Sequence, residues 1–249
     1  MPDVASARRI RALIDLTDLG PACTEADIER LCRRAVDHRP FVAAVCVWPR
    51  FVAQAARLLV GTGVKVATVV NFPSGGTDVA ATLAETSLVL ADGADEIDLV
   101  IPYRALLDGD VEVARSMVVA VRAAVLAPVH LKVILETGSY PSQREVRSAA
   151  DLAIGAGADF VKTSTGKTDR SATPEAARTL LEAIRDAGRA VGLKPSGGIR
   201  SLADAETYLA LADEVMGPQW AAPTTFRFGA SGLLDAVDEA IDAALAEPG

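Results

Sequence analysis

Gly157-Ala-Asp-Phe-Val-Lys-Thr-Ser-Thr-Gly-Lys167 is the stretch of sequence on which the predicted fold depends. Its first residues fit the end of a helix, Phe160 and Val161 are strand formers, and 163–167 is a polar loop. Lys162 stands where the strand ends, although lysine is seldom buried without a partner. A solvated lysine at a strand end is therefore the simplest interpretation, unless other polar residues meet it there.

Two further stretches change that interpretation. The segments 93–98 and 157–162 both begin with Gly-Ala-Asp, and their alignment places Asp98 opposite Lys162. Lys194 ends another apolar stretch and is followed by a glycine pair. Two lysines and an aspartate at the same ends of three strands can share one pocket. Burial and a second ammonium group both lower the pKa of a lysine, which is what an amine nucleophile requires.

Apolar runs and helical patterns alternate along the chain. The runs predict strands at 41–47, 65–70, 96–101, 130–135, 160–163, 190–194, 214–216 and 225–228. The patterns predict helices at 8–16, 24–37, 49–59, 77–92, 111–126, 142–155, 173–188, 201–212 and 231–245. This alternation predicts an α/β fold, a single (β/α)8 TIM barrel with a short N-terminal helical extension. The segment 217–224 is too short for a crossover helix, so a short turn there and a doubly wound open sheet remain the alternatives.

Length and charge narrow the class of protein. The 249 residues fit one barrel domain spanning 1–249, since no linker composition or charge run divides them. A net charge of −8 argues against a nucleic-acid or membrane-surface partner. The N-terminus lacks an apolar signal region, and no apolar run reaches the roughly 18 residues of a membrane span.

Cysteine and histidine usage points to a reducing compartment without a metal centre. Cys23, Cys32 and Cys46 have no paired spacing that would indicate disulfides, which predicts a cytoplasmic protein. His38 and His130 form no metal-ligand spacing with these cysteines, so we expect no metal ion.

Several long motifs, in order, resemble the signature blocks of the deoxyribose-phosphate aldolase family, whose members are class I Schiff-base aldolases. They are Ile14-Asp-Leu-Thr17, Asn71-Phe-Pro-Ser-Gly75, Glu96-Ile-Asp-Leu-Val-Ile-Pro-Tyr-Arg104, Phe160-Val-Lys-Thr-Ser-Thr-Gly-Lys167, Gly192-Leu-Lys-Pro-Ser-Gly-Gly-Ile-Arg200 and Phe226-Arg-Phe-Gly-Ala-Ser231. The resemblance runs from about Ile14 to Leu234 and implies the barrel. It also implies reversible cleavage of 2-deoxy-D-ribose 5-phosphate to acetaldehyde and D-glyceraldehyde 3-phosphate, in deoxyribonucleoside catabolism. Phosphosugar and aldehyde substrates, no cofactor and a homodimer follow from the same resemblance.

The resemblance assigns the catalytic roles to three residues. Lys162 is expected to form the Schiff base, whose iminium acts as an electron sink for C–C cleavage. Lys194 is expected to depress the pKa of Lys162, although it could simply be a lysine beside a phosphate loop. Asp98 is expected to be the general acid/base acting through water, or an ion-pair partner that neutralises a lysine; both can hold.

Small-residue loops after the late strands are candidates for a phosphate site. The predicted phosphate-binding residues are Gly166, Lys167, Gly197, Gly198, Gly229 and Ser231. Glycines allow close backbone approach, and the last helix begins just after Ser231, where its N–H groups would face an anion. Glycine pairs alone more often mark turns, but their position matches a recurrent phosphate site of barrels.

By resemblance, five residues support the pocket: Asp15, Thr17, Cys46, Lys132 and Thr165. A cysteine in an apolar strand, such as Cys46, is more often plain core, because a free cysteine packs as a small hydrophobe. Lys132 either lines the barrel interior or faces outward.

The sequence departs from the family pattern in two places. Gly232 stands where many members have a second serine, and the chain ends in Ala-Glu-Pro-Gly249 without the terminal tyrosine of some members. The alternative functions are another Schiff-base barrel aldolase with a different donor or acceptor, and a catalytically silent phosphosugar-binding barrel. The presence of Lys162, Asp98 and Lys194 disfavours the silent barrel.

Overall fold

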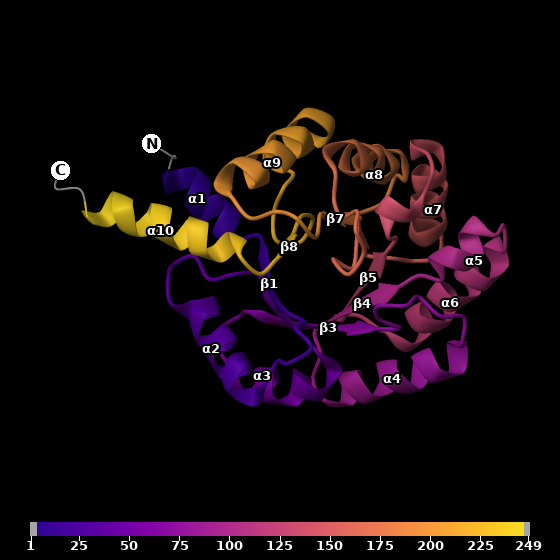
Figure 1. The fold of residues 1–249 in the computed structure, drawn as a ribbon, viewed down its shortest axis with the longest axis horizontal. Coiled ribbons are helices and arrows are strands. Elements are labelled where there is room, and N and C mark those ends of the chain that lie inside the picture. The colour runs from indigo at the N-terminus through magenta and orange to yellow at the C-terminus, as the bar shows by residue number, and fades with distance from the viewer. Residues whose placement is uncertain (1–3, 247–249) are drawn as a thin grey trace.

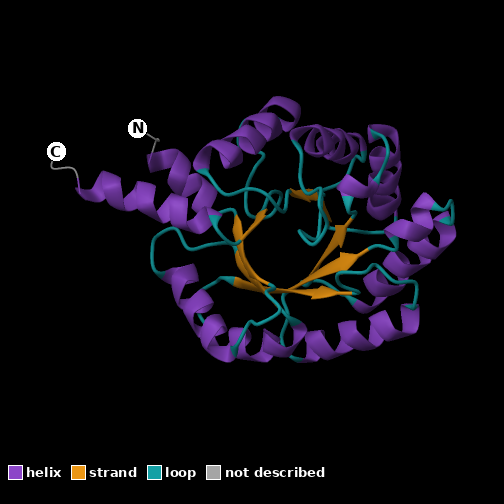
Figure 2. Ribbon diagram, viewed as in Figure 1, coloured by secondary structure: helices purple, strands orange, loops and turns teal. Residues whose placement is uncertain are grey.

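The computed structural model describes residues 4–246, and its eight strands in this range form one parallel sheet. The strands are β1 (Ile14–Asp18), β2 (Ala44–Val47), β3 (Lys65–Val70), β4 (Glu96–Val100), β5 (His130–Ile134), β6 (Phe160–Lys162), β7 (Gly192–Lys194) and β8 (Phe228–Ala230). The order in the sheet is β7-β6-β5-β4-β3-β2-β1-β8. Figure 2 shows these strands as a ring surrounded by helices.

Short backbone contacts close the gap between β7 and β8. The amide of Leu193 donates to the carbonyl of Thr225 at 2.9 Å, and the amide of Arg227 donates to the carbonyl of Leu193 at 2.9 Å. A further parallel bridge joins Ser196 to Gly229. The predicted (β/α)8 barrel is therefore confirmed.

Helices cover the outside of the ring (Figure 1). The α-helices are α1 (Val4–Arg11), α2 (Glu25–Val36), α3 (Val52–Leu58), α4 (Val79–Ala91), α5 (Tyr103–Leu107), α6 (Val111–Ala124), α7 (Gln143–Gly155), α8 (Pro174–Asp186), α9 (Leu202–Met216) and α10 (Leu233–Ala246). Two 3-10 turns, η1 (Pro49–Phe51) and η2 (Thr137–Ser139), follow β2 and β5. Helix α1 precedes the first strand and packs against α10 beside the barrel, as the predicted N-terminal extension requires.

Local sequence explains where the helices begin. Thr24 and Ser201 each form a capping box. The hydroxyl accepts a hydrogen bond from the backbone N–H three residues later, and the aspartate at that position accepts one from the backbone N–H of the capping residue. Thr173 caps α8, whose first residue is Pro174, a position where the missing N–H costs nothing. These signals fix the helix starts close to their predicted positions.

Two predicted elements were wrong: one strand was missed and one predicted strand is helical, so the predicted number of strands is still eight. Residues 14–16, predicted as the end of the helix 8–16, belong to strand β1, and 214–216, predicted as a strand, is the last turn of α9. Ile10, Leu13 and Ile14 have helical spacing, yet the chain leaves the helix after Arg11. The loop 217–224 thus links α9 to β8 and needs no crossover helix. The short helix α5 was not predicted.

The base of the barrel depends on one glycine. A Cβ placed on Gly192 would overlap the ring of Phe160, so only glycine leaves room for this side chain in the interior. Phe160 is fully buried and lies two residues before Lys162 on the same strand. Since side chains two apart share a face, Lys162 also projects into the barrel, closer to the carboxyl end where sites of this fold lie.

Candidate active site

The three predicted catalytic side chains meet inside the barrel. Asp98 projects from β4, and its Oδ2 lies 2.8 Å from the Nζ of Lys162 at the end of β6. The same oxygen lies 2.8 Å from the Nζ of Lys194 at the end of β7. All three side chains are buried, so Lys162 is not the solvated strand-end lysine of the simplest interpretation. Asp98 is an ion-pair partner of both lysines, and its acid/base role remains a prediction.

A second tier of charges lies beside this trio. Lys132 lines the barrel interior, which decides its orientation, and its Nζ lies 2.5 Å from Glu96 and 3.1 Å from Asp98. Asp15 lies 2.6 Å from the Nζ of Lys194. Arg227 reaches Asp15 at 2.6 Å and Glu96 at 2.8 Å. The interior therefore holds one continuous network of buried ion pairs.

Glu96 and Arg227 were missed as site residues. Glu96 stands two residues before Asp98, so strand periodicity alone places both carboxyl groups on one face. Arg227 lies between Phe226 and Phe228, and an arginine between two aromatic residues next to a strand signals a buried, paired guanidinium. Both signals are visible in the sequence.

Burial and neighbouring charges shift the lysines in opposite directions. Burial lowers the pKa of Lys162; the carboxylate of Asp98 raises it and Lys194 lowers it, and the net pKa lies below the ordinary value. Burial also lowers the pKa of Lys194, but Asp15 and Asp98 outweigh burial and hold that pKa above its ordinary value. Lys194 thus helps to lower the pKa of Lys162, as predicted, but burial lowers that pKa more.

The carboxyl group of Asp98 is held ionised. Burial raises its pKa, but the ammonium groups of Lys132, Lys162 and Lys194 outweigh burial and hold the pKa well below its usual range. An ionised carboxylate between two lysines can orient an amine, and its part in proton transfer remains a prediction. Imine chemistry requires both functions.

The side of the interior formed by β2 and β3 is apolar. Cys46 is fully buried and packs with small hydrophobic residues, which are Leu19, Ala44, Ala67 and Val69. Burial raises the pKa of the Cys46 thiol, so the group is neutral near neutral pH. Cys46 therefore packs as a core residue, which was the alternative to a role in supporting the pocket, although it faces Asp98, Lys162 and Lys194.

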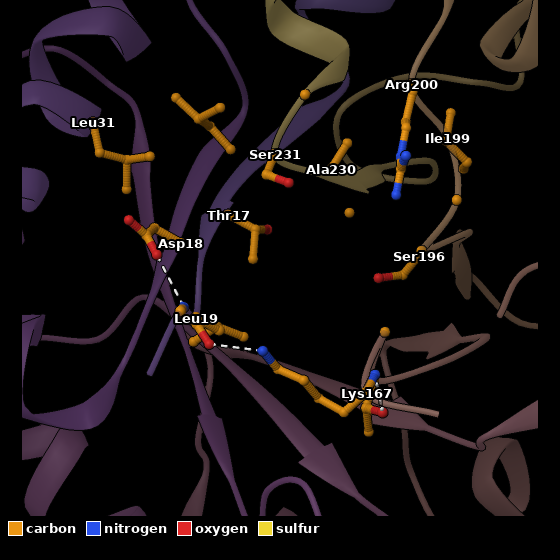
Figure 3. A pocket seen from close by; sticks show the side chains of 18 of the residues that line it. Thr17, Asp18, Leu19, Leu31, Lys167, Ser196, Ile199, Arg200, Ala230 and Ser231 are labelled. Atoms are coloured by element: carbon orange, nitrogen blue, oxygen red, sulfur yellow. Dashed lines mark hydrogen bonds between the residues drawn. The ribbon is translucent and has the colours of Figure 1, made fainter. Parts of the chain in front are cut away.

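A pocket of about 570 Å³ opens above this interior, at the carboxyl ends of the strands (Figure 3). Its lining includes all six predicted phosphate-binding residues, which are Gly166, Lys167, Gly197, Gly198, Gly229 and Ser231. Thr17, Thr165 and the divergent Gly232 also line it. The structure thus gathers loops that are distant in the sequence around one cavity.

Two glycines of the pocket are required by close packing. A Cβ on Gly229 would lie 2.6 Å from Ser196 Oγ and 3.1 Å from the Cε of Lys194. Gly197 has φ +87°, and a Cβ there would meet Ser171 at 2.6 Å. Gly229 thus lies directly against the Lys194 side chain, which connects the pocket wall with the buried charges.

The lining of the pocket includes the cationic residues Arg34, Lys167 and Arg200, and the last two come from the loops after the neighbouring strands β6 and β7. The Nζ of Lys167 donates to the carbonyl oxygen of Leu19 at 2.8 Å, along one edge of the pocket in Figure 3. Arg200, which was not predicted, points into the cavity from the loop after β7. Its position two residues after a glycine pair was the available signal, since guanidinium groups bind phosphate well.

Thr165 is fixed by a buried carboxylate. Its hydroxyl donates to Glu136 at 2.5 Å, and the backbone amide of Lys167 donates to the Thr165 hydroxyl at 3.1 Å. Glu136 adopts a left-handed backbone conformation with φ 59°, which is uncommon outside glycine and asparagine. Glu136 therefore braces the loop that carries Gly166 and Lys167.

The described part of the chain shows neither a metal cluster nor a membrane span. Between residues 4 and 246, no group of three or more His, Cys, Asp or Glu side chains is arranged to hold a metal ion. No helix in this range has the length and apolar character needed to cross a membrane. The divergent C-terminal residues 247–249 lie outside the described range.

Comparison with known proteins identifies the family. Residues 10–237 match the DeoC/LacD family aldolases. The chain belongs to this family. It is an aldolase, and it is 54% identical over 228 residues to "Deoxyribose-phosphate aldolase" of Agrobacterium fabrum, covering 91% of this chain and 88% of that protein.

Solved structures of aldolases share the barrel. A deoxyribose phosphate aldolase from Aeropyrum pernix, described as a tetramer, superposes with a TM-score of 0.79 at 29% identity over 94% of this chain and 92% of its own. An aldolase named QR15 gives a TM-score of 0.81 at 28% identity, covering 96% and 99% of the two chains. The resemblance found in the sequence is thereby confirmed at the level of family and fold.

Proposed function

We propose that this aldolase reversibly cleaves 2-deoxy-D-ribose 5-phosphate to acetaldehyde and D-glyceraldehyde 3-phosphate through a Schiff base on Lys162. The observation that carries the proposal is the contact of Lys162 and Lys194 with one carboxylate oxygen of Asp98, beneath a pocket lined by glycine loops. The similarity to the Agrobacterium fabrum aldolase supports the substrate.

The first half of the reaction builds the electron sink. The neutral amine of Lys162 attacks the aldehyde carbon of the open-chain sugar, and the resulting carbinolamine loses water to give an iminium ion. In this proposal Asp98, acting through water, transfers the proton that the amine releases to the new hydroxyl group, and the ammonium group of Lys194 supplies the second proton with which that hydroxyl leaves as water. Acid/base assistance of this kind contributes about 10²- to 10⁴-fold.

The second half of the reaction cleaves the sugar and regenerates the free amine of Lys162. Asp98, acting through water, takes the proton of the C3 hydroxyl and later returns it to C2; the C2–C3 bond breaks, and its electron pair moves into the iminium to give an enamine. Glyceraldehyde 3-phosphate leaves with its new aldehyde group. Protonation of the enamine at C2 and addition of water to the imine then release acetaldehyde and restore the amine of Lys162.

The pocket above the trio is the proposed phosphate site. Gly197, Gly229 and Ser231 line it, while Lys167 and Arg200 bring positive charge from the loops after β6 and β7. Local cations are needed here because the whole chain carries a net charge of −8, which repels an anion at long range. Arg200→Ala should therefore raise KM for the phosphorylated sugar, by about tenfold or more, and leave KM for unphosphorylated 2-deoxyribose nearly unchanged.

Covalent trapping tests the nucleophile. Reduction with borohydride in the presence of acetaldehyde should add one ethyl group to Lys162, located by mass spectrometry of the peptides. Exposed Lys65 serves as the internal control for non-specific alkylation. Trapping on Lys167 or Lys194 that spares Lys162 would overturn the assignment.

A second aldolase chemistry remains testable with the same protein. If the natural donor or acceptor differs, trapping at Lys162 persists while 2-deoxyribose 5-phosphate is cleaved slowly compared with other phosphorylated aldoses. A silent phosphosugar-binding barrel would bind the sugar phosphate and give neither trapping nor cleavage. Each of the three functions thus predicts a different pair of results.

We also expect a single-domain homodimer that acts in the cytoplasm without a metal or an organic cofactor. Native mass spectrometry reports the assembly, for which the tetramer of Aeropyrum pernix is the contrasting precedent. Activity should survive exhaustive EDTA treatment, since the iminium takes the role that a Lewis acid has in metal-dependent aldolases. Loss of activity that Zn²⁺ restores would contradict the proposed mechanism.

A further inference from the structure

Arg227 joins two carboxylates in the barrel interior, and no step of the proposed reaction uses it. Its Nη1 lies 2.6 Å from Asp15 Oδ1, and its Nη2 lies 2.8 Å from Glu96 Oε1. Its Nε donates to the carbonyl oxygen of Pro223, and its side chain is only 4% exposed. The guanidinium is therefore held by several bonds at a fixed point of the network.

The network contains more basic groups than acidic ones. Its members are Asp15, Glu96, Asp98, Lys132, Lys162, Lys194 and Arg227. Three carboxylates thus face four basic side chains, and full ionisation would leave one uncompensated positive charge in the interior. An unpaired buried charge is costly, and the group concerned loses its charge instead. Arginine does not deprotonate in proteins, so the released proton comes from a lysine.

The contacts indicate which lysine is neutral. Lys132 lies within 3.4 Å of three carboxyl groups, those of Asp15, Glu96 and Asp98. Lys194 lies at 2.6 and 2.8 Å from the carboxyl groups of Asp15 and Asp98. Lys162 contacts Asp98 alone, at 2.8 Å. The amine with the fewest anionic partners loses its proton first.

We propose that Arg227 is a positioning residue that keeps Lys162 uncharged, because it supplies the fourth basic group and the network balances only when one lysine is neutral. The inference rests on the proposed Schiff-base function, which requires a free amine at Lys162. The directions of the pKa shifts agree with it: the pKa of Lys162 is lowered, while those of Lys132 and Lys194 are raised. Glu96 has the opposite influence, since it adds a negative charge.

Few other titratable groups face this network. Cys46 on β2 is neutral, because burial raises the pKa of its thiol, and the adjacent interior of β3 presents Ala67 and Val69. His130 on β5 approaches Glu96 at 3.8 Å, and its side chain is 40% exposed. Burial raises the pKa of Glu96, but Lys132, the contact with His130 and Arg227 outweigh burial and hold that pKa well below its usual range.

The decisive experiment changes the charge count by one charge at a time. The rate of trapping of acetaldehyde on Lys162 with cyanoborohydride is measured across pH for wild type, R227M, E96Q and the double variant R227M/E96Q. In R227M three lysines face three carboxylates, so Lys162 becomes protonated and the rising limb of the profile moves to higher pH. A limb that lies one pH unit higher lowers trapping near neutral pH about tenfold, and trapping recovers in more alkaline buffer.

For E96Q and R227M/E96Q we expect the rising limb to move in other directions than in R227M. E96Q leaves four basic groups and two carboxylates, which favours the free amine and moves the rising limb to lower pH. R227M/E96Q restores one excess basic group, so its limb returns toward that of wild type although two native side chains are missing. R227K keeps the charge and should shift the limb less than R227M.

Matched controls separate charge balance from loss of structure. Arg11 is another fully buried arginine, paired with Asp238 at 2.8 Å between α1 and α10. R11M should lower the thermal midpoint and leave the position of the limb unchanged. H130Q tests whether titration of the imidazole, and not of Lys162, sets the pH at which trapping rises. The rising limb of this variant should lie at nearly the same pH as that of wild type.

Several outcomes would overturn the proposal. They are an unshifted limb in R227M, a limb in E96Q that stays or moves upward, and a double variant that shifts as far as R227M. If R227M does not fold, E96Q decides the matter by the direction of its shift, and R227K by whether its limb stays close to that of wild type. If wild type itself is not trapped at Lys162, the proposed function fails, whereas normal trapping with unshifted variants removes only the role of Arg227.

Discussion

The two sides of the barrel interior are built from opposite kinds of residue. Strands β4 to β7, β1 and the approach to β8 contribute seven interlocked charged side chains. Strands β2 and β3 contribute Ala44, Cys46, Ala67 and Val69, which carry no charge and little volume. Both sides are buried equally, so exposure to water does not explain the difference.

The contrast shows how a barrel can combine a reactive amine with a stable core. A low-polarity wall beside Lys162 strengthens the effect of burial, which favours the uncharged amine. The opposite wall prevents the remaining charges from being unpaired, which would be costly. Four substitutions, in order of decreasing expected effect, test this division.

Lys162→Met should have the largest effect, because it removes the nucleophile from the charged side. Turnover should fall by at least about 10³-fold at every pH, and acetaldehyde trapping should disappear. The fold should remain, since methionine fills most of the volume and replaces an amine that is uncharged in the balanced network. Circular dichroism and thermal unfolding check the fold, and substantial cleavage by a folded Lys162→Met protein would contradict the assignment.

Asp98→Asn should follow, with a loss of about 10²- to 10⁴-fold in kcat, the usual contribution of a general acid/base. The pKa of Lys162 should fall further, because the nearby carboxylate that raises it is gone. The rising limb of kcat/KM therefore moves to lower pH while the maximum rate drops. Breaking a buried pair also costs about 3–5 kcal/mol of stability, so unfolding is measured in parallel. A rate loss without the downward shift would assign Asp98 no charge effect on Lys162.

Much of this arrangement could be predicted from the sequence, and the misses have physical reasons. The Gly-Ala-Asp repeat predicted that Asp98 and Lys162 would meet, because parallel strands end on the same side of a barrel. Strand β1 was missed because Ile10, Leu13 and Ile14 fit a helix as well as a strand entry. Short apolar runs do not distinguish the two states, since only packing decides between them.

The site was predicted less completely than the fold. The sequence motifs contain the residues that touch the substrate in the proposed reaction, but they do not single out Arg227 and Glu96, which act on other side chains. Which charges pair depends on side-chain reach across the barrel, and the sequence does not encode that distance locally. The two orientations left open for Lys132 were equivalent in the strand pattern. Its three carboxylate partners explain why it faces inward.

Lys194→Leu should have an intermediate effect that depends on pH. Lys194 lowers the pKa of Lys162, so its removal raises that pKa and moves the rising limb of activity to higher pH. If that pKa rises by about one pH unit, the amount of free amine near neutral pH falls about tenfold. A more alkaline buffer should then recover much of the trapping. The measurement is the pH profile of imine trapping. An unchanged profile would mean that burial alone sets the amine and that Lys194 serves only substrate binding or proton transfer.

Cys46→Ala should have the smallest effect, because it alters the apolar side, where no charge contributes to the reaction. Burial raises the pKa of the thiol, so the side chain is uncharged across the working range and its loss removes no ion. The small cavity should cost about 0.5–2 kcal/mol of stability. Turnover should change by less than about threefold, since that corresponds to well under 1.4 kcal/mol in the barrier. Val69→Ala, on the neighbouring strand, is the control for cavity formation alone. If Cys46→Ala moved the rising limb while Val69→Ala did not, the thiol would belong to the charge balance and the division of the interior into two sides would fail.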